Sequence, residues 1–283
     1  MNENENIEED FPILKKFPYL KKNIKAGEIL KVVREKSKTL IEEEKKLLEI
    51  AEFVEKKILS LRGGIAFPLN ISLNDQAAHY SPPFNDETTL KKGDYVKVDI
   101  GVHLEGFIAD SAYTIKVGEE KDDLIKASEK ALSEAISIIK AGVKTNEIGG
   151  VIQEAIEGYG LKPVENLSGH ALKEYSFHAA PSIPNTDTGK GVPLKEGDVI
   201  ALEPFATDGV GRVIDDDRTY IYSYLAFRPL RLAMAKRMMF YIKKNFPQLP
   251  FAERWVVKSK KDEFALRYLL RKSVVFPYYV LKE

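Results

Sequence analysis

The stretch LKKGDYVKVDIGVHLEGFIADSAYTI at residues 90–115 decides the fold, because it predicts a β-hairpin that carries two acids. Apolar residues alternate with other residues over 96–103, which is typical of a half-buried strand. A turn follows at 104–106, and a second alternating run begins directly after it. If the hairpin has no bulge and closes about the midpoint between residues 104 and 105, Asp99 faces Asp110.

The two acids on this hairpin indicate a shared cation. Residues that face one another on one side of an antiparallel pair have their Cβ atoms about 4.5–5.5 Å apart. Two ionised carboxylates at that distance are destabilising unless they share a proton or bind a cation. The alternative is a pair of solvated aspartates on an exposed face, and the hairpin alone does not decide between the two.

The motif that opens this hairpin recurs later in the chain. Residues 194–203 read LKEGDVIALE, against LKKGDYVKVD at 90–99, so Glu203 takes the place of Asp99. A stretch of helical composition precedes each copy. An internal repeat of this size predicts two similar half-domains. A pseudo-twofold relation between the halves would bring the two acids to one central place.

Composition restricts the classes of protein and of site. The chain has 283 residues, of which 44% are hydrophobic and 30% charged, and this favours a soluble globular protein. It contains no cysteine, which excludes disulfides and sulfur-ligated metals and is consistent with a reducing cytoplasm. No apolar run approaches the roughly 20 residues of a membrane helix. The acidic start MNENENIEED lacks the pattern of a signal peptide.

The net charge of zero hides an asymmetry. Residues 228–272 contain 13 Lys/Arg and 3 Asp/Glu, whereas residues 1–227 contain 29 and 39. A basic segment on an acidic body can face nucleic acid, and the alternative is a solvated helix surface.

Helices and a second hairpin are expected outside the repeated motif. An apolar stripe and the pair Gly63–Gly64 predict a helix that ends near residue 61. Asp215–Asp217 are expected to interrupt a further hairpin, and SVVFPYYVL at 273–281 is expected to be a strand. The basic segment is expected to be an inserted helical subdomain. The expected helices are 26–61, 124–139, 147–158, 230–242 and 263–270.

Three of the four histidines lie beside the acidic strands. His79 and His178 each precede an LKxGD motif within a proline-containing loop, and His170 follows Gly169, which permits a tight backbone turn. A lone histidine is more often a satisfied core or surface residue than a ligand, but matching positions in both halves favour a site.

One imidazole with three carboxylates suits hard or intermediate metals. Asp99, Asp110, His170 and Glu203 would together hold Mn, Fe, Co or Zn rather than copper. A bridging carboxylate makes two ions about 3.5–4 Å apart plausible, and such a pair activates water and polarises a carbonyl. This is the chemistry of hydrolysis, in which the two other histidines would contact the substrate.

These residues resemble a known family, the type 2 (archaeal and eukaryotic) methionine aminopeptidases. The resemblance runs from about residue 25 to 283 and implies an α/β (α+β) pita-bread fold with two pseudo-symmetric halves and antiparallel sheets flanked by helices. It also implies a single catalytic domain over 1–283 with a helical insert at 229–272. The motifs that carry it are AFPLNISLNDQAAHYSP (66–82), VKVDIGVHLEGFIADSAYT (96–114), NLSGH (166–170), HAAPSIPN (178–185) and ALEPFATDG (201–209).

The same resemblance implies roles for the site residues. His79 matches the histidine near the scissile bond, and His178 matches the one that contacts substrate and intermediate. Phe67 and Asn70 would lie by the pocket for the methionine side chain. The implied metal ligands are Asp99, Asp110, His170 and Glu203.

The resemblance further implies cofactors and partners. Two divalent ions (Co, Mn, Fe or Zn) and removal of the initiator methionine from nascent chains are expected. We expect a cytoplasmic monomer without DNA or membrane partners, and contact with the ribosome through the basic insert is a further hypothesis.

One position departs from the family pattern. The family has a fifth ligand, a glutamate in a Glu-His-Thr context on a strand that follows the segment written here as YYVLKE, and Glu283 comes too early to be its equivalent. The glutamate is then truncated, supplied separately or lost, and its absence should weaken the second metal first. Two alternatives to this function are a proline-directed peptidase of the same fold and a non-catalytic relative that binds ribosome or RNA.

Overall fold

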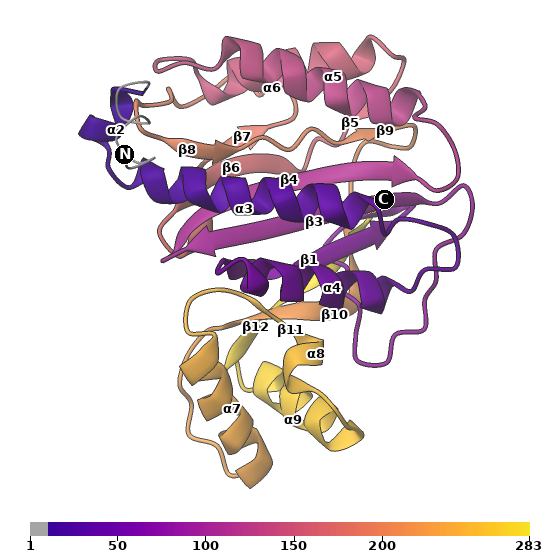
Figure 1. Cartoon of the computed structure of the whole chain (residues 1–283), viewed down its shortest axis with the longest axis vertical. Coiled ribbons are helices and arrows are strands. Elements are labelled where there is room, and N and C mark those ends of the chain that lie inside the picture. Colours follow the sequence, from indigo (N-terminus) through magenta and orange to yellow (C-terminus); the bar gives the residue numbers. More distant parts are fainter. Residues whose placement is uncertain (1–10) are drawn as a thin grey trace.

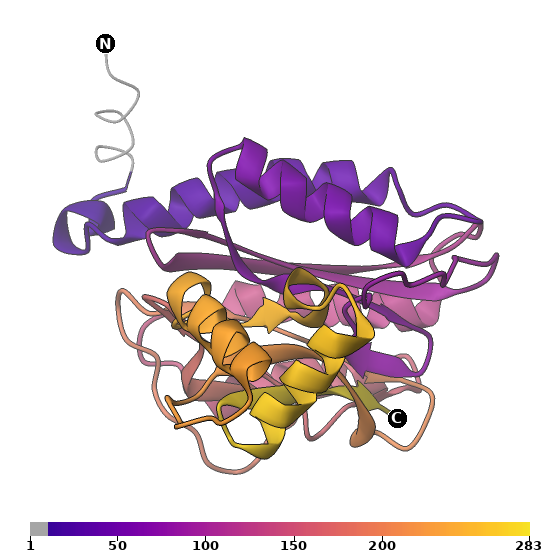
Figure 2. The same ribbon diagram turned by 90° about the horizontal axis from the view of Figure 1, so that it is seen from below.

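A computed structural model describes residues 11–283; the acidic sequence MNENENIEED lies outside the described residues. Two helix-covered sheets face one another, and a helical extension projects from one end (Figure 1). In the first half two helices lie side by side on one face of an antiparallel sheet of order β1-β3-β4 (Figure 2). The elements are α2 (Ile13–Lys16), α3 (Leu20–Lys38), α4 (Leu47–Ser60), β1 (Gly64–Leu73), β3 (Tyr95–Leu104) and β4 (Phe107–Lys116).

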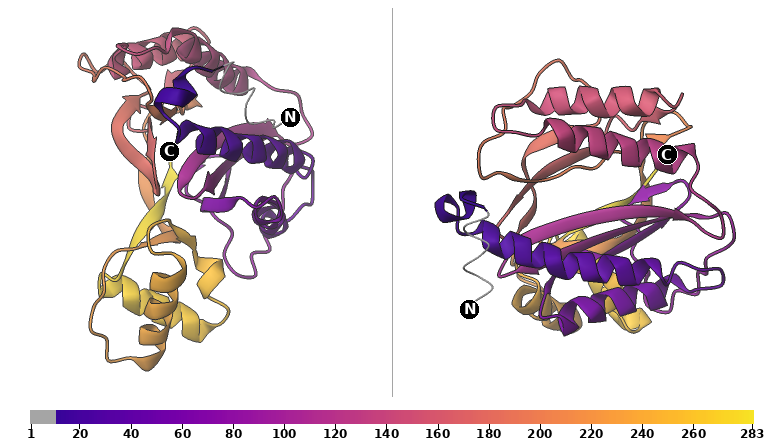
Figure 3. Two further views of the ribbon diagram at one scale, coloured as in Figure 1. Left: turned by 60° about the vertical axis from the view of Figure 1, so that its left-hand side comes forward. Right: turned by 45° about the horizontal axis from the view of Figure 1, so that its top comes forward.

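The second half repeats this arrangement. A pair of helices covers the antiparallel sheet β7-β6-β8, and the pair β5-β9 lies beside it (Figure 3). The elements are α5 (Asp123–Ile138), α6 (Thr145–Glu157), β5 (Lys162–Pro163), β6 (Ser168–Lys173), β7 (Ser176–Pro184), β8 (Val199–Ala201) and β9 (Ala206–Thr207).

A third sheet, of order β11-β10-β12-β2, joins the halves to the helical extension. The extension has its own apolar core, centred on Met239, Phe251 and Leu269. It projects away from the paired sheets (Figure 3). The elements are β2 (Gln76–Ala78), β10 (Ile214–Tyr224), α7 (Ala233–Asn245), β11 (Phe251–Ala252), α8 (Glu253–Val256), α9 (Lys260–Arg271) and β12 (Val275–Lys282).

The two LKxGD copies adopt the same turn. Gly93 and Gly197 have φ of 87° and 90°, a left-handed conformation that glycine adopts without strain. In each copy the aspartate that follows accepts a hydrogen bond from the N–H of the motif's lysine, at 2.9 Å from Asp94 and 2.8 Å from Asp198. The leucine that opens each copy is buried. The repeat in the sequence therefore corresponds to a repeat in the structure.

Two expectations about the elements are wrong. The helix expected over 26–61 is two helices, because residues between them pair with the segment before the first LKxGD turn: the Glu44 N–H donates to the Leu90 carbonyl at 2.9 Å. Asp215–Asp217 do not separate two strands of a hairpin. They lie within β10, whose partner β12 returns only after the helical extension.

The other expected helices and the closing strand are present. Helices α5, α6, α7 and α9 begin and end within about three residues of the expected positions, and β12 falls in the expected closing segment.

Candidate active site

The β3–β4 hairpin places both of its aspartates on one face. The two-residue turn Glu105–Gly106 has φ of 49° and 89°, and positive φ at both positions matches the twist of a tight hairpin. Asp99 pairs with Ala112 and Asp110 with Gly101, so the aspartates are diagonal neighbours. The expectation that they face one another directly is therefore wrong by two residues. A shift of two preserves the face, and diagonal side chains remain within reach of one another.

The second half contributes an imidazole and a carboxylate from neighbouring strands. His170 lies on β6 and pairs with Ala201 on β8, two residues before Glu203. A Cβ at Gly169 would lie 2.3 Å from the carbonyl oxygen of Ala201, so a glycine is required for β6 and β8 to approach this closely. Gly169 is thus needed for strand packing and not for the tight turn that the sequence indicated.

The two halves meet in a cluster of potential metal ligands. Ligand atoms of Asp110, His170 and Glu203 lie within 4.8 Å of one another. Nε2 of His170 is 2.8 Å from Oε1 of Glu203 and 3.9 Å from Oδ2 of Asp110. Asp99 lies close to this group, because its pKa responds to the charges of Glu203 and His170 and to the neighbouring carboxyl of Asp110. The structure thus brings together all four residues that the sequence indicated as ligands.

The donor set fits a divalent cation. The second ring nitrogen of His170, Nδ1, lies 3.3 Å from the carbonyl oxygen of Ala171, which can only accept. If Nδ1 carries the proton, the lone pair of Nε2 points at the Glu203 carboxylate, and this contact requires a proton or a cation between the two atoms. A backbone carbonyl that orients the second nitrogen is also the usual arrangement of a metal-binding histidine.

The electrostatics of the carboxylates lead to the same conclusion. Burial raises the pKa of Asp99 to about 7, and the charge of Glu203 adds to the shift. Burial, followed by the charges of Asp99 and Glu203, raises the pKa of Asp110 well above its usual value. The site therefore resists full ionisation on its own, and a bound cation would offset the repulsion.

The two remaining site histidines flank this cluster. The rings of His170 and His178 have centroids 4.4 Å apart. Desolvation by the walls of the site lowers the pKa of His178 to about 3, and the neighbouring imidazoles add to the shift. Burial also lowers the pKa of His79, whose Nδ1 lies 3.0 Å from the carbonyl oxygen of Tyr279 on β12. Because that oxygen accepts, Nδ1 of His79 carries the proton and Nε2 remains an acceptor.

An aromatic wall connects the predicted pocket residues with the histidines. The ring of Phe177 lies 5.8 Å from Phe67, 5.9 Å from Tyr278 and 4.2 Å from His178, between centroids. Tyr278 in turn lies 5.9 Å from His79. Sequence reasoning missed Phe177 and Tyr278. The position of Phe177 next to a site histidine was an available signal, but Tyr278 reaches the site only through the pairing of β12.

Asn70 joins the predicted pocket to the acidic cluster. It pairs with Asp99 across β1 and β3, and its Nδ2 lies 3.4 Å from Oδ2 of that aspartate. Its Oδ1 is buried and has no hydrogen-bond partner among the described residues, so this acceptor is available to a ligand. Glu283 is engaged elsewhere, by the Thr207 hydroxyl and by the Gly211 N–H at 2.6 Å. That Glu283 is no metal ligand stays a prediction.

Comparisons with known proteins agree with this site. A model of metallopeptidase family M24 matches residues 21–224. The methionine aminopeptidase of Thermococcus onnurineus is 50% identical over 264 residues, which cover 92% of this chain and 90% of that protein. This chain belongs to the methionine aminopeptidases of family M24. The methionine aminopeptidase of Methanocaldococcus jannaschii is 48% identical, with 93% and 89% covered.

Solved structures of the family share the fold. The methionine aminopeptidase of Thermotoga maritima has a TM-score of 0.66 at 29% identity and covers 71% of this chain and 84% of its own. The prolidase of Pyrococcus furiosus scores 0.56 at 26% identity, with 66% and 56% covered. A thermophilic Arx1 scores 0.80 over 94% of this chain and 84% of its own, and at 18% identity it shows the fold alone. The expected pita-bread fold is confirmed. Within residues 11–283, no helix is long and apolar enough to cross a membrane.

Proposed function

We propose that this chain hydrolyses the bond after an N-terminal methionine in peptides and nascent proteins, in a metal-dependent reaction. The observation that carries the proposal is the cluster of Asp110, His170 and Glu203, assembled from both halves of a methionine aminopeptidase fold. A proline-directed peptidase is less favoured, because the archaeal relatives of 45–50% identity are methionine aminopeptidases over nearly the whole chain.

The metal would be held by side chains from both halves. We assign it to Asp99, Asp110, His170 and Glu203, and three carboxylates leave room for two ions, of Mn, Fe, Co or Zn. When bound, divalent cations polarise a carbonyl group and lower the pKa of water, which is the chemistry that peptide hydrolysis needs.

The neighbouring side chains would bind and orient the substrate. His79 presents Nε2 as an acceptor, which suits the N–H of the scissile peptide bond. His178 is neutral at physiological pH and can donate a hydrogen bond to the carbonyl oxygen, where negative charge develops. Phe67 and Phe177 offer an apolar wall to the methionine side chain. The free Oδ1 of Asn70 can accept from the substrate amine.

A peptidase assay on histidine variants tests the proposal. With Met-Ala-Ser as substrate, His79→Ala and His178→Ala should lower kcat by about 10²-fold or more, because each removes a group that acts on the reacting bond. Their metal content should equal that of the parent. His103→Ala, at the β3–β4 turn, is the matched control and should retain activity. Methionine release by both site variants at the parent rate would contradict the assigned roles.

The helical extension supports a further partner. We propose that residues 229–272 form an insert within a single catalytic domain, and that its surface contacts ribosomal RNA in the cytoplasm. All of its Lys and Arg side chains except Arg254 are exposed. Replacing four exposed basic residues of α7 by glutamine should abolish salt-sensitive co-sedimentation of this monomer with ribosomes. Co-sedimentation that ignores both salt and these substitutions would exclude the electrostatic contact.

A further inference from the structure

Strand β1 is interrupted where it passes the active site. Phe67 pairs with Gly101 and Asn70 with Asp99, so two residues of β1, Pro68 and Leu69, lie opposite the single residue between Gly101 and Asp99. Such a bulge re-aims the flanking side chains and removes the extra residue from the ladder. Pro68 has no N–H to lose, but the backbone groups of Leu69 need other partners.

Two side chains from outside the sheet satisfy the backbone of Leu69. Its N–H donates to Oε1 of Glu55 on α4 at 3.2 Å. Its carbonyl accepts from the hydroxyl of Ser81 at 2.7 Å. Ser81 follows His79 by two residues, so this second bond also ties the His79 segment to β1. All three residues are buried.

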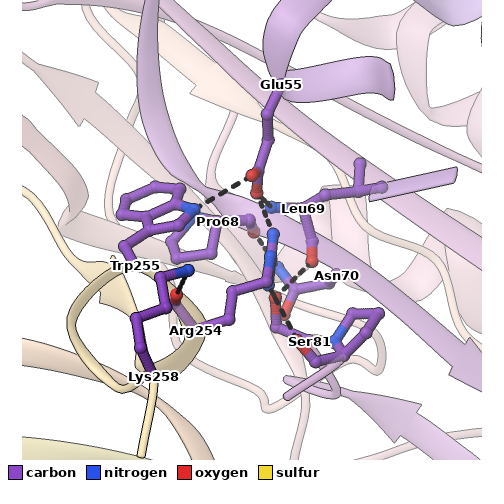
Figure 4. A network of polar contacts seen from close by, with 9 residues as sticks. Glu55, Pro68, Leu69, Asn70, Ser81, Arg254, Trp255 and Lys258 are labelled. Atoms are coloured by element: carbon purple, nitrogen blue, oxygen red, sulfur yellow. Dashed lines mark hydrogen bonds and ion pairs between the residues drawn. The ribbon is translucent and has the colours of Figure 1, made fainter. Parts of the chain in front are cut away.

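A single side chain of the insert holds both of these groups (Figure 4). Arg254 on α8 forms an ion pair with Glu55 and donates to the Ser81 hydroxyl at 2.6 Å. It also donates to the carbonyl of Pro82 at 3.2 Å, while the indole N–H of Trp255 donates to Glu55 at 3.0 Å. Arg254 is 3% exposed, in contrast to every other basic residue of the insert.

We propose that Arg254 is a positioning residue for substrate binding: through Glu55 and Ser81 it fixes the β1 bulge and with it Phe67 and Asn70. The proposal rests on the function proposed above and assigns the insert a role inside the catalytic unit. It also gives the buried ion pair a role other than stability, since well-packed neutral side chains often replace such pairs without loss.

Kinetics of a neutral replacement of the pair separate positioning from stability. Arg254→Met alone would leave the Glu55 carboxylate buried without its partner, which is strongly destabilising. The double variant Glu55→Gln/Arg254→Met leaves no buried charge without a partner, but it removes the N–H groups that donate to the Ser81 hydroxyl and the Pro82 carbonyl. KM for Met-Ala-Ser should rise about tenfold while kcat changes less than twofold, because two hydrogen bonds of ordinary strength are lost. Arg228→Met, the same substitution at an exposed site just before the insert, should change neither constant.

Ser81→Ala provides the second, milder variant. It keeps the ion pair and removes one hydroxyl, so KM should rise about fivefold. Calorimetry of L-methionine binding should show the same loss of affinity as KM in both variants, with the metal content of the parent. Tm should fall by only a few degrees, because one or two buried hydrogen bonds are lost. If the double variant does not unfold cooperatively, Ser81→Ala alone decides.

The possible outcomes separate the two proposals. Raised KM with matching loss of methionine affinity, measured at a temperature well below the Tm of each variant, supports the positioning role. Parent-like KM in both variants, or a change in Tm alone, overturns it and leaves the proposed function intact. A parent chain that neither binds methionine nor releases it from peptides would overturn the proposed function and this inference with it.

Discussion

Replacing Asp110 by Asn should have opposite effects on the metal-free and metal-loaded protein. In the metal-free protein, Asp110 lies within 4.8 Å of the Glu203 carboxylate, and two unit charges at that distance repel by about 3 kcal/mol at an effective dielectric constant of about 20. The folded state must bear this repulsion or take up a proton, because burial raises the pKa of Asp110. The unfolded aspartate ionises freely above about pH 4. Asp110→Asn should therefore stabilise the metal-free protein at pH 8 by about 1–3 kcal/mol, part of the repulsion being offset by His170.

The sign of the pH dependence follows from linkage. A carboxyl group whose pKa is raised on folding costs no stability below about pH 4, and the cost grows as pH rises toward the folded pKa. The advantage of Asp110→Asn should thus be largest at pH 8 and absent near pH 4. With metal the order reverses, because the parent gains binding free energy that the variant loses with its charged ligand.

Thermal unfolding with and without added Mn²⁺ or Co²⁺ tests this prediction. A gain of 1–3 kcal/mol corresponds to a rise of roughly 2–5 °C in Tm for the metal-free variant at pH 8, because unfolding a chain of 283 residues has an entropy of about 0.6 kcal/mol/K. Asp208→Asn, at an exposed aspartate, should shift Tm by a degree or less. A metal-free variant that is less stable than the parent at pH 8, or one that metal stabilises as strongly as the parent, would refute the reasoning.

Metal affinity, the ionisation of Glu253 and the packing at Gly169 can each be tested separately. Metal affinity, measured by calorimetry, should fall as the pH is lowered through about 7, because protons compete with the metal for Asp99 and Asp110. A metal affinity that stays constant between pH 5 and 8 would contradict this prediction. Burial raises the pKa of Glu253 to about 7. In denaturant titrations, Glu253→Gln should therefore stabilise the folded protein by about 1–2 kcal/mol at pH 8.5 and have no effect at pH 4.5. An effect that does not depend on pH would argue against an ionised carboxylate at this position. Gly169→Ala places a Cβ 2.3 Å from the Ala201 carbonyl oxygen. The variant should lose about 1–3 kcal/mol of unfolding free energy and bind metal more weakly. Stability and metal affinity equal to those of the parent would show that β6 and β8 can separate freely.

The residues of the site could be predicted from the sequence, but the pairing register of the β3–β4 hairpin could not. Alternation and the duplicated LKxGD motif predicted the hairpin, the two halves and the convergence of Asp99 with Glu203. The hairpin register depends on a two-residue turn with positive φ at Glu105. Glutamate is not one of the residues, such as Asn, Asp and Gly, that usually indicate such a turn in a sequence. Because sheet faces alternate with period two, the error of two residues left the ligand prediction unharmed.

Features that depend on distant contacts were beyond sequence reasoning. The break between α3 and α4 arises from pairing with Leu90, which local helix propensity does not register. Tyr278 and the carbonyl of Tyr279 reach the site because β12 joins β10 after the whole insert. Arginine is usually a surface residue, and only the fold shows that Arg254 is buried against α4 and β1.

We expect the acids from the two duplicated halves to hold divalent cations at the point where they meet. Anomalous diffraction from crystals grown with Mn²⁺ or Co²⁺ tests this expectation most directly. We predict a strong anomalous peak in contact with Asp110, His170 and Glu203, with Asp99 beside it and a second, weaker peak nearby. A well-ordered site with no anomalous density between these side chains, at a cation concentration that saturates the protein in calorimetry, would contradict it.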